Sequence, residues 1–241
     1  MIVEKTYNVK ISETMANCEM TNKAILGDLE NVACNHSDFA GYGVYDVPKT
    51  HLTWILLEWK LKVIKRPKYG EEIIAKTWSR NSSRCYAYRD FEIYDKQGTK
   101  IAIAASKWVL IDTEKRKIIK VEDSVIEKYY PELEKSVFKD EDFPKIREPE
   151  KYENEVEYKV KRADIDVNNH MHNLNYLDLA NEALPEKIYI EENFNNIRIS
   201  YKKEIKLGEN VKCKYSFENG KHIVVVKNED ESVLHAIIEM E

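Results

Sequence analysis

The sequence predicts an α+β protein of two similar halves, each with an antiparallel sheet wrapped around one helix. Strand-like segments joined by tight turns occur in both halves of the 241-residue chain, and one amphipathic segment precedes the main strands of each half. The halves also share a duplicated segment. KYGEEIIAKTW (68–78) and KLGENVKCKYS (206–216) align without a gap, each with a lysine and a Gly-Glu turn before an alternating strand.

The first half contains four segments in which apolar residues alternate with polar ones, as in antiparallel strands. They are LTWILLEWKLKVI (52–64), EEIIAKTWSR (71–80), YAYRDFEIYD (86–95) and KIAIAASKWVLID (100–112). The turn DKQG (95–98) predicts a hairpin between the last two. We expect a helix over 20–36, with Thr21 or Asn22 as its N-cap.

The second half repeats this rhythm. Its expected strands are NIRISYKKEI (196–205), ENVKCKYSFE (209–218), KHIVVVKNED (221–230) and SVLHAIIEM (232–240), with ENG (218–220) as a hairpin turn. A helix is expected over 173–185, where Asn173 can act as the N-cap and Pro185 follows the end.

An acidic stretch with three prolines, PELEKSVFKDEDFPKIREPE (131–150), separates the two halves. Proline and charge in such a run are typical of a linker. We therefore predict a first domain over 1–130, a linker over 131–150 and a second domain over 151–241.

Composition limits the classes of function. The chain is 43% hydrophobic and 34% charged, with a mean hydropathy of -0.59. Its longest apolar runs, at 101–106 and 222–226, are far shorter than the roughly 20 residues of a membrane span. Glu4 and Lys5 follow the first residues at once, without an apolar signal segment. We expect a cytoplasmic protein that does not enter a membrane.

The cysteines and the charges argue against several partners. Cys18, Cys34, Cys85 and Cys213 include no C-x-x-C pair, so neither a structural zinc site nor a disulfide framework is expected. We expect reduced, mostly buried thiols, no metal and no cofactor. The net charge of -5 is spread over mixed signs without a basic arm, so nucleic acid is not an expected partner.

Short polar side chains are concentrated just before the second expected helix, in DIDVNNHMHNLNYLDLANEALP (164–185). Asp and Asn favour turns because they bond their own backbone. A turn alone does not explain their order.

The segment DIDVNNHMHNLNY resembles the D-x-D-x-N-x-H-x-x-N-x-x-Y signature of acyl-acyl carrier protein thioesterases, a family of tandem hotdog domains. The first-half segments WILLEWKLKVIKRPKYGE, TWSRNSSRCYAYRDFEIYD and ASKWVLID are similar to that family as well. The resemblance implies a double hotdog fold. It also implies hydrolysis of fatty acyl-acyl carrier protein (acyl-ACP) thioesters to free fatty acid and holo-acyl carrier protein, in fatty acid biosynthesis.

The resemblance also implies the catalytic residues. Asp166, Asn168 and His170 fall on the family's Asp-x-Asn-x-His, and Glu204 falls on the catalytic glutamate of the following strand. Plant members often have a cysteine after that glutamate, where this chain has Ile205. A cysteine nucleophile is therefore not expected at this position.

Hydrolysis of a thioester needs an activated water and donors for the developing oxyanion. Either Glu204 or His170 can act as the base, while Asp166 orients the site and Asn168 holds water or substrate.

The oxyanion donors are expected at the start of the second helix. The backbone N–H groups near Asn173 and Leu174 lie at the positive end of the expected helix dipole, where they would polarise the thioester carbonyl.

The partner implied by the resemblance is strongly acidic, so positive charge is expected near the site. The first candidates are Lys202, Lys203 and Lys206, beside Glu204 in the sequence; Arg66 and Lys68 form a second group.

The resemblance places the acyl-chain tunnel in the first half. The residues that can line it or fill a core are Ala24, Ile25, Leu29, Trp54, Leu56 and Trp108.

Three other functions fit the same fold: hydrolysis of acyl-CoA, a dehydratase, and a non-catalytic acyl-binding regulator. The dehydratase is disfavoured because the site residues suit water activation, and the regulator because all four polar residues are retained. The two halves can form the hotdog pair within one chain. A monomer can then be complete, while homodimerisation stays open.

Overall fold

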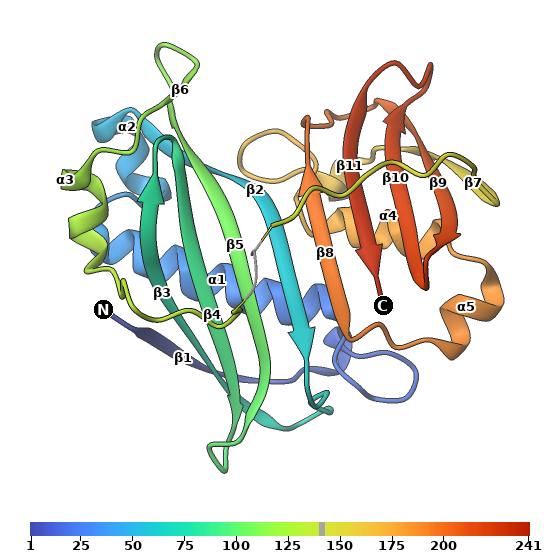
Figure 1. The fold of residues 1–241 in the computed structure, drawn as a ribbon, viewed down its shortest axis with the longest axis horizontal. Helices are drawn as coiled ribbons and strands as arrows, with labels where there is room; N and C mark the ends of the chain where they lie inside the picture. The colour runs from blue at the N-terminus through green and yellow to red at the C-terminus, as the bar shows by residue number, and fades with distance from the viewer. Residues whose placement is uncertain (140–142) are drawn as a thin grey trace. The chain divides into compact units, whose positions relative to one another are not determined.

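The computed structural model describes residues 1–139 and 143–241, so residues 140–142 of the predicted linker lie outside the described part. The chain divides into two compact units, Met1–Asp142 and Phe143–Glu241. Each unit is an antiparallel sheet with a main helix in contact with its strands (Figure 1).

The sheet of the first unit has the order β1-β3-β4-β5-β2, and β6 pairs with the end of β5. Its strands are β1 (Val3–Asn8), β2 (Leu52–Val63), β3 (Glu72–Ser83), β4 (Tyr86–Asp95), β5 (Lys100–Asp112) and β6 (Lys117–Ile119). Its helices are η1 (Ile11–Glu13), α1 (Asn22–Ala40), η2 (Val44–Asp46), α2 (Val47–Thr50), α3 (Asp123–Ile126) and η3 (Glu127–Tyr129).

Helix α1 begins and ends at sequence signals. The Thr21 hydroxyl accepts from the Ala24 N–H at 3.1 Å and confirms the first of the two expected N-caps. Gly41 ends the helix with a φ of 78°, a left-handed conformation that glycine adopts without strain. Ile25 and Leu29 lie fully buried on the face that packs on the sheet, and such a side chain contributes about 1.5–3 kcal/mol.

The second unit repeats this order as β7-β9-β10-β11-β8. Its strands are β7 (Asn154–Lys159), β8 (Asn196–Tyr201), β9 (Asn210–Glu218), β10 (Lys221–Asn228) and β11 (Leu234–Met240). Its helices are η4 (Arg162–Asp164), α4 (Asn175–Ala183) and α5 (Glu186–Glu191). Contacts with β7, β9, β10 and β11 hold α4 to the sheet.

The predicted duplication is confirmed by the backbone. Lys68 N–H donates to Glu71 Oε2 before β3, and Lys206 N–H donates to Glu209 Oε2 before β9, both at 2.9 Å. Gly70 and Gly208 take the same left-handed conformation, with φ values of 79° and 81°. The two segments therefore fold alike because they encode the same turn and strand.

The segments with the clearest alternation fold as predicted. β4 and β5 have the expected bounds, and the turn between them carries Gly98 at a φ of 80°. The turn at 218–220 is confirmed as the hairpin between β9 and β10, with Asn219 and Gly220 both at positive φ.

The helix predicted over 173–185 is shorter, and its predicted cap is wrong. α4 begins at Asn175, with Leu174 as N-cap and no side-chain cap bond. The Asn173 carbonyl accepts from the Tyr201 hydroxyl at 2.9 Å, which holds this residue outside the helix. After Leu184, Pro185 becomes the N-cap of the short helix α5.

Two edge strands were not predicted. β1 and β7 close one edge of their sheets, pairing with β3 and β9 respectively. Most of β1 is exposed, and its sequence shows no regular apolar alternation. β7 does alternate in sequence and in burial, but the segment NEVEYK was not singled out as a strand.

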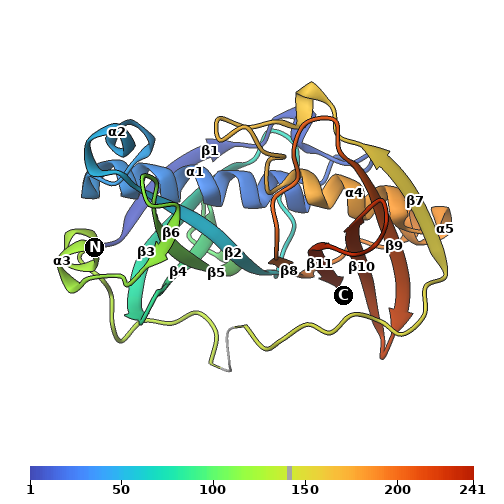
Figure 2. The same ribbon diagram turned by 90° about the horizontal axis from the view of Figure 1, so that it is seen from above.

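The described part of the linker contacts both units. In the first unit, Lys135 Nζ lies 3.0 Å from Glu92 Oε2, and Val137 N–H donates to Asp90 Oδ2 at 2.9 Å. Figure 2 shows this segment on the side of the strands opposite α1. In the second unit, Lys227 Nζ lies 2.7 Å from Glu148 Oε2.

The predicted burial of the cysteines is wrong. Cys213 is buried, Cys85 is half-buried, and Cys18 and Cys34 are exposed. The last two lie in a turn and on the outward side of α1, where the sequence pattern alone does not fix the direction of a side chain.

Within the described residues, no helix is long and apolar enough to cross a membrane. Nor do these residues include a group of three or more His, Cys, Asp or Glu side chains placed to hold a metal ion. The cytoplasmic location stays a prediction.

Candidate active site

The loop from Ile165 to Met171 closes with an isolated β-bridge between its ends. Inside it, Asp166 N–H donates to the His170 carbonyl at 2.9 Å, and Asn169 N–H donates to the Asp166 carbonyl at 3.1 Å. Asn169 has a φ of 62°, a conformation that asparagine tolerates better than most residues. The loop therefore holds His170 in a fixed turn.

The Asp166 carboxylate stabilises this turn. Its Oδ1 accepts from the Asn168 N–H at 2.8 Å and lies 3.5 Å from the His170 N–H. The Asn168 amide nitrogen lies 3.5 Å from Oδ2. Asp166 thus contacts backbone and side-chain groups on either side of the turn.

Glu204 lies in a second loop, beside the first. It was expected on a strand, but β8 ends at Tyr201 and the chain leaves the sheet there. Met171 N–H donates to the Ile205 carbonyl at 2.8 Å, which joins the two loops next to His170 and Glu204. As a result, His170 Nε2 lies 3.2 Å from Glu204 Oε1.

A buried histidine fixes the other side of the Glu204 loop. His235, 3% exposed, has its Nδ1 at 3.0 Å from the Lys203 carbonyl. The His235 carbonyl accepts from the N–H groups of Lys202 and Lys203, at 2.8 and 3.3 Å. Glu204 is therefore held from both sides of the loop.

The pair remains accessible to water. The side chains of His170 and Glu204 are 31% and 51% exposed. A carboxylate and an imidazole at hydrogen-bond distance, both facing solvent, can accept a proton from a bound water and return it to a leaving group.

The predicted oxyanion donors lie at the N-terminal end of α4. Leu174 N–H points at His172 Nδ1, at a long 3.4 Å. A substrate carbonyl that uses this N–H must displace the imidazole. The structure thus adds an acceptor, His172 Nδ1, that competes with the substrate for the expected donor. The sequence motif alone does not reveal this competition.

Tyr176 lies under the site. Its ring packs edge-on against Tyr201 with centroids 5.3 Å apart. Burial, and then the charge of Glu204, raises the pKa of the Tyr176 hydroxyl far above its ordinary value. This phenol stays protonated and supports the site as a packing group.

A hollow of about 760 Å³ opens beside Glu204 within the second unit. Its lining residues are Lys203, Glu204, Lys206, Gly208, Glu209, Asn210, Asn228, Glu229, Asp230, Val233 and His235. Two of the three expected lysines line it, and Lys206 Nζ lies 3.9 Å from Glu204 Oε1. The hollow combines these cations with carboxylates, so its charge is mixed.

The second group of expected docking cations is partly wrong. Arg66 is only 9% exposed. Its Nη1 donates to the Met20 carbonyl at 2.9 Å and to Asn22 Oδ1 at 3.0 Å. Arg66 therefore supports the start of α1 instead of presenting charge to a partner.

The first unit has a loop with the same backbone. Met15 N–H donates to the Glu19 carbonyl, and Met20 N–H to the Pro67 carbonyl, both at 2.8 Å. Cys18 takes the left-handed place of Asn169, with a φ of 63°.

The side chains of this second loop differ. Where the second unit has Asp166, Asn168, His170 and Glu204, the first has Met15, Asn17, Glu19 and Arg66. Here a carboxylate takes the place of the histidine and a guanidinium that of the glutamate, so the first loop lacks a matching base.

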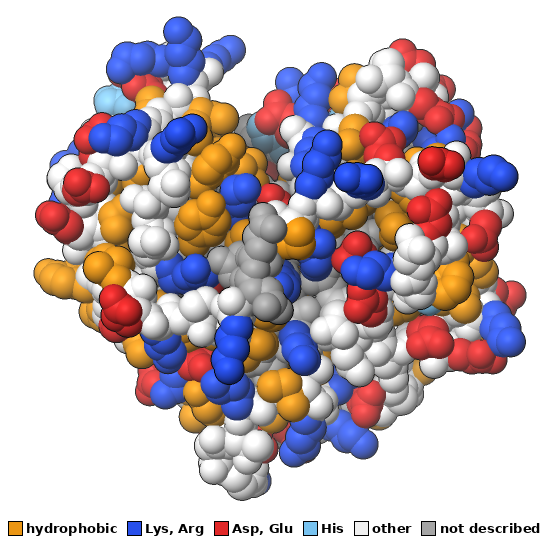
Figure 3. All heavy atoms as spheres, viewed as in Figure 1, with side chains coloured by type: hydrophobic (Ala, Val, Ile, Leu, Met, Phe, Trp, Pro, Cys, Tyr) orange, Lys and Arg blue, Asp and Glu red, His pale blue; other side chains and the backbone are white. Residues whose placement is uncertain are grey.

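One basic cluster was not singled out from the sequence. The turn between β5 and β6 carries Lys115 and Arg116, β6 begins at Lys117, and Lys120 follows it. Figure 3 shows Lys and Arg side chains gathered where Figure 1 draws this turn. The signal was the run TEKRKIIK (113–120).

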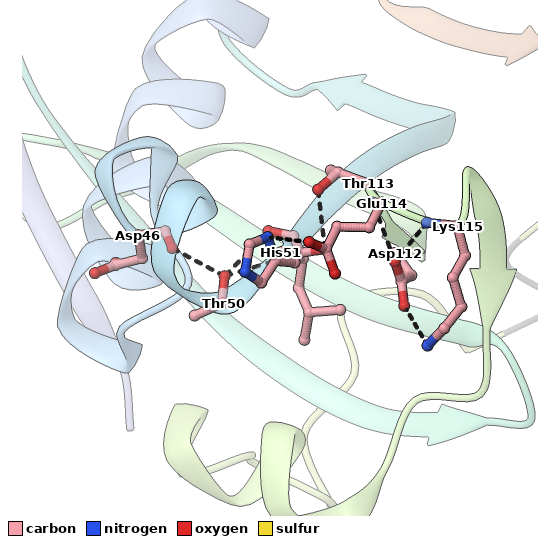
Figure 4. A network of polar contacts seen from close by, with 8 residues as sticks. Asp46, Thr50, His51, Asp112, Thr113, Glu114 and Lys115 are labelled. Atoms are coloured by element: carbon pink, nitrogen blue, oxygen red, sulfur yellow. Dashed lines mark hydrogen bonds and ion pairs between the residues drawn. The ribbon is translucent and has the colours of Figure 1, made fainter.

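The base of this turn is fixed to the residues after α2 (Figure 4). Thr113 donates to the His51 carbonyl from its N–H at 2.9 Å and its hydroxyl at 3.1 Å. Asp112 Oδ1 accepts from the N–H groups of Glu114 and Lys115 at 3.1 and 2.9 Å. The cations are thus presented on a braced turn.

The two units define the class of protein as a double hotdog, and solved structures agree. An acyl-ACP thioesterase from Bacteroides thetaiotaomicron superposes with a TM-score of 0.88 at 21% identity, covering 99% of this chain and 96% of that one. The 12:0-ACP thioesterase from Umbellularia californica gives 0.87 at 19% identity, covering 100% and 96%. The predicted fold class is confirmed.

The chain belongs to the acyl-ACP thioesterase family. The family's N-terminal domain matches residues 1–129 and its C-terminal domain matches residues 147–240. Oleoyl-acyl carrier protein thioesterase 1, chloroplastic, from Arabidopsis thaliana is 27% identical over 217 residues, which make up 83% of this chain. This chain spans 60% of the length of that relative. The resemblance found in the sequence is confirmed.

Proposed function

We propose that this protein hydrolyses fatty acyl-ACP thioesters to a free fatty acid and holo-acyl carrier protein. The observation that carries the proposal is the 3.2 Å contact between His170 Nε2 and Glu204 Oε1, on two joined loops that face solvent. Relatives and structural neighbours named as acyl-ACP thioesterases support the choice of substrate.

The Glu204–His170 pair acts as the base. It takes a proton from water as the water oxygen attacks the thioester carbon. The resulting tetrahedral intermediate carries its negative charge on the former carbonyl oxygen. When the C–S bond breaks, the thiolate leaves with the electron pair and takes up the proton from the pair. A thiolate is a good leaving group, so the step requires no covalent intermediate.

Asp166 and Asn168 position the catalytic groups. Asp166 holds the turn that presents His170, and Asn168 places its amide beside the same carboxylate. The N–H groups of Asn173 and Leu174 polarise the carbonyl once the substrate displaces His172 from Leu174.

The first unit, in this proposal, holds the acyl chain. Its half-buried residues Trp54 and Trp108 flank a cluster of buried apolar residues, whereas Ile25, Leu29 and Leu56 are fully enclosed and fill the core. Lys202, Lys203 and Lys206 offer positive charge to the acidic carrier protein beside Glu204.

The test is release of free thiol from acyl-ACP thioesters of graded chain length, with acyl-CoA thioesters in parallel. Wild type should release thiol, and His170→Ala should lower kcat/KM by about 10²–10⁴-fold. Faster turnover of every CoA thioester would move the substrate class to acyl-CoA. No release from any thioester, with acyl binding intact, would indicate a non-catalytic acyl-binding protein.

A further inference from the structure

Four residues form one row across the sheet of the first unit. The strand register pairs Ser79 of β3 with Arg89 of β4, Arg89 with Ser106 of β5, and Ser106 with Trp59 of β2. All four are buried, with exposed fractions from 0% to 7%. A buried polar row is unexpected in a domain whose interior should receive an alkyl chain.

Arg89 points from this row toward α1. Its Nη1 donates to His36 Nδ1 at 2.9 Å and to Thr77 Oγ1 at 3.2 Å. Its guanidinium carbon lies 5.5 Å from the centre of the Tyr129 ring. These contacts fix the guanidinium, and each of them is with a neutral group.

His36 is neutral and adds no charge to that of Arg89. Because Nδ1 accepts from Arg89, the proton lies on Nε2, which is 3.1 Å from the Tyr129 carbonyl. Burial and the charge of Arg89 lower the pKa of His36 to about 3, while burial lowers that of Arg89 to about 10. At neutral pH the cluster is a single buried cation.

Within the described part of the chain, Arg89 makes no ion pair with a carboxylate; its contacts are with His36, Thr77 and Tyr129. A buried charge without a counter-charge is costly, and proteins usually pair such a charge or use it to hold an anion. The guanidinium is therefore a candidate for a ligand with negative charge.

Trp59 gives a second, independent observation. Its Nε1 is buried, and no described residue accepts a hydrogen bond from it. Its ring lies 5.0 Å from that of Phe91, two residues along β4 from Arg89 and on the same face of the sheet. The row thus contains a buried cation whose hydrogen-bond acceptors are neutral and a buried N–H donor for which no described residue is an acceptor.

The neighbouring positions are apolar and reach the surface. The next row pairs Ala87 with Trp108 and Trp108 with Leu56. Trp54 and Trp108 are partly exposed and pack on the cluster that contains Tyr129. An alkyl chain that lies along these rings would place a polar end group at Arg89.

We propose that the first unit binds the terminal carboxylate of an alkyl chain, with the carboxylate on Arg89 and Trp59 and the chain along Trp108 and Trp54. The identity of the ligand as an alkyl chain depends on the proposed function. The binding of a carboxylate is inferred only from the buried row that contains Arg89 and Trp59. Two sources share this chemistry: the released fatty acid, and an acyl thioester with a second carboxyl group at its far end.

The test follows the indole ¹H–¹⁵N signal of Trp59, assigned with Trp59→Phe, as decanoate or decan-1-ol is added. Wild type should bind decanoate about 10- to 100-fold more tightly than decan-1-ol. Arg89→Met should lose this preference, and Arg89→Lys should keep part of it. Arg80→Met is the matched control, because Arg80 belongs to the same unit but pairs with Asp90 at 3.4 Å.

Equal binding of the acid and the alcohol by wild type would overturn the proposal, and that comparison needs no variant. So would an equal loss in Arg89→Met and Arg80→Met. The two sources are separated by comparing kcat/KM for decanoyl thioester and for decanedioic acid monothioester. If kcat/KM is higher for the decanedioic acid monothioester and this preference disappears in Arg89→Met, the carboxylate site serves the substrate. If decanoate binds but kcat/KM shows no such preference, the site serves the released product. The binding of decanoate is measured without any hydrolysis. The result therefore stays interpretable even if the protein proves not to be a hydrolase.

Discussion

Side chains near the site divide into those that hold the loops and those that face solvent. Polar side-chain atoms of Asp166 and His235 form hydrogen bonds with the backbone of the two loops. His170 and Glu204 contact one another and remain open to water. We propose a positioning role for the first group from their hydrogen bonds, and a catalytic role for the second from their exposure and distance.

Asp28 provides a pH-dependent test at the residue scale. Burial, with the nearby charge of Glu13 adding to it, raises the pKa of Asp28 to about 6 from an ordinary 3.8. The folded state therefore holds a proton that the unfolded chain releases. This contribution to stability is full below about pH 4 and is lost as the pH rises through about 6.

Asp28→Asn keeps the shape of the side chain and removes its charge. We expect the variant to raise the free energy of unfolding at pH 8 by about 1 kcal/mol, after allowance for solvent screening, and to change it little at pH 4. Urea unfolding at both pH values measures this. Asp178→Asn, on the exposed side of α4, is the control. A gain that is equal at the two pH values would contradict the assignment.

Among the elements, the two duplicated loops share one backbone conformation but carry different side chains, so the effects of a mutation on stability and on activity can be measured separately. Asn169 and Cys18 occupy the same left-handed position, with φ values of 62° and 63°. A β-branched residue is strained there. Asn169→Val and Cys18→Val should each destabilise their unit by about 1–3 kcal/mol.

Only the first change should affect turnover strongly, because Asn169 precedes His170 whereas Cys18 precedes Glu19. We expect kcat/KM to fall about tenfold or more in Asn169→Val, since displacement of a positioned group by about 1 Å can cost that much. Urea unfolding and thiol release on both variants check this. An equal loss of activity in the two variants would place chemistry in both loops.

How well an element could be predicted depended on how local its signal is. β4 and β5 were predicted with their bounds because alternation and the Gly98 turn lie within the segment itself. The start of α4 was misplaced because the hydroxyl of Tyr201, in β8, donates a hydrogen bond to the Asn173 carbonyl. The strand through Glu204 was predicted too long because the N–H groups of Lys202 and Lys203 both donate to the carbonyl of His235 in β11, and the regular pairing of β8 ends there.

The same distinction holds for the site. Asp166, Asn168, His170 and Glu204 were predicted from a motif and a resemblance. The hollow beside Glu204 and the row through Arg89 were not, because both depend on contacts between distant parts of the chain. The His36–Arg89 contact, for example, joins residues 53 positions apart, and no local pattern marks it.

For the molecule as a whole, the net charge of -5 would oppose the acidic partner that we propose, so we expect association to depend on local cations. Changing Lys202, Lys203 and Lys206 to Gln should raise KM for acyl-ACP at low salt about tenfold relative to KM for the same acyl group on N-acetylcysteamine. The effect should shrink as salt is added.

The control for that prediction removes an equal charge from the turn between β5 and β6 and the first residue of β6, as Lys115→Gln, Arg116→Gln and Lys117→Gln together. We expect a change of less than about twofold, within the range of screened surface charge. A tenfold rise in the control alone would assign carrier-protein docking to the first unit.

We propose that the carboxylate of Glu204, paired with His170, activates water for thioester hydrolysis. Its most direct measurement is the single-turnover rate of thiol release from acyl-ACP by wild type, Glu204→Gln and Glu229→Gln. Glu229 lines the same hollow and serves as the matched carboxylate. We predict a loss of about 10²–10⁴-fold in Glu204→Gln and a rate close to wild type in Glu229→Gln. A Glu204→Gln enzyme that retains the wild-type rate would contradict the claim.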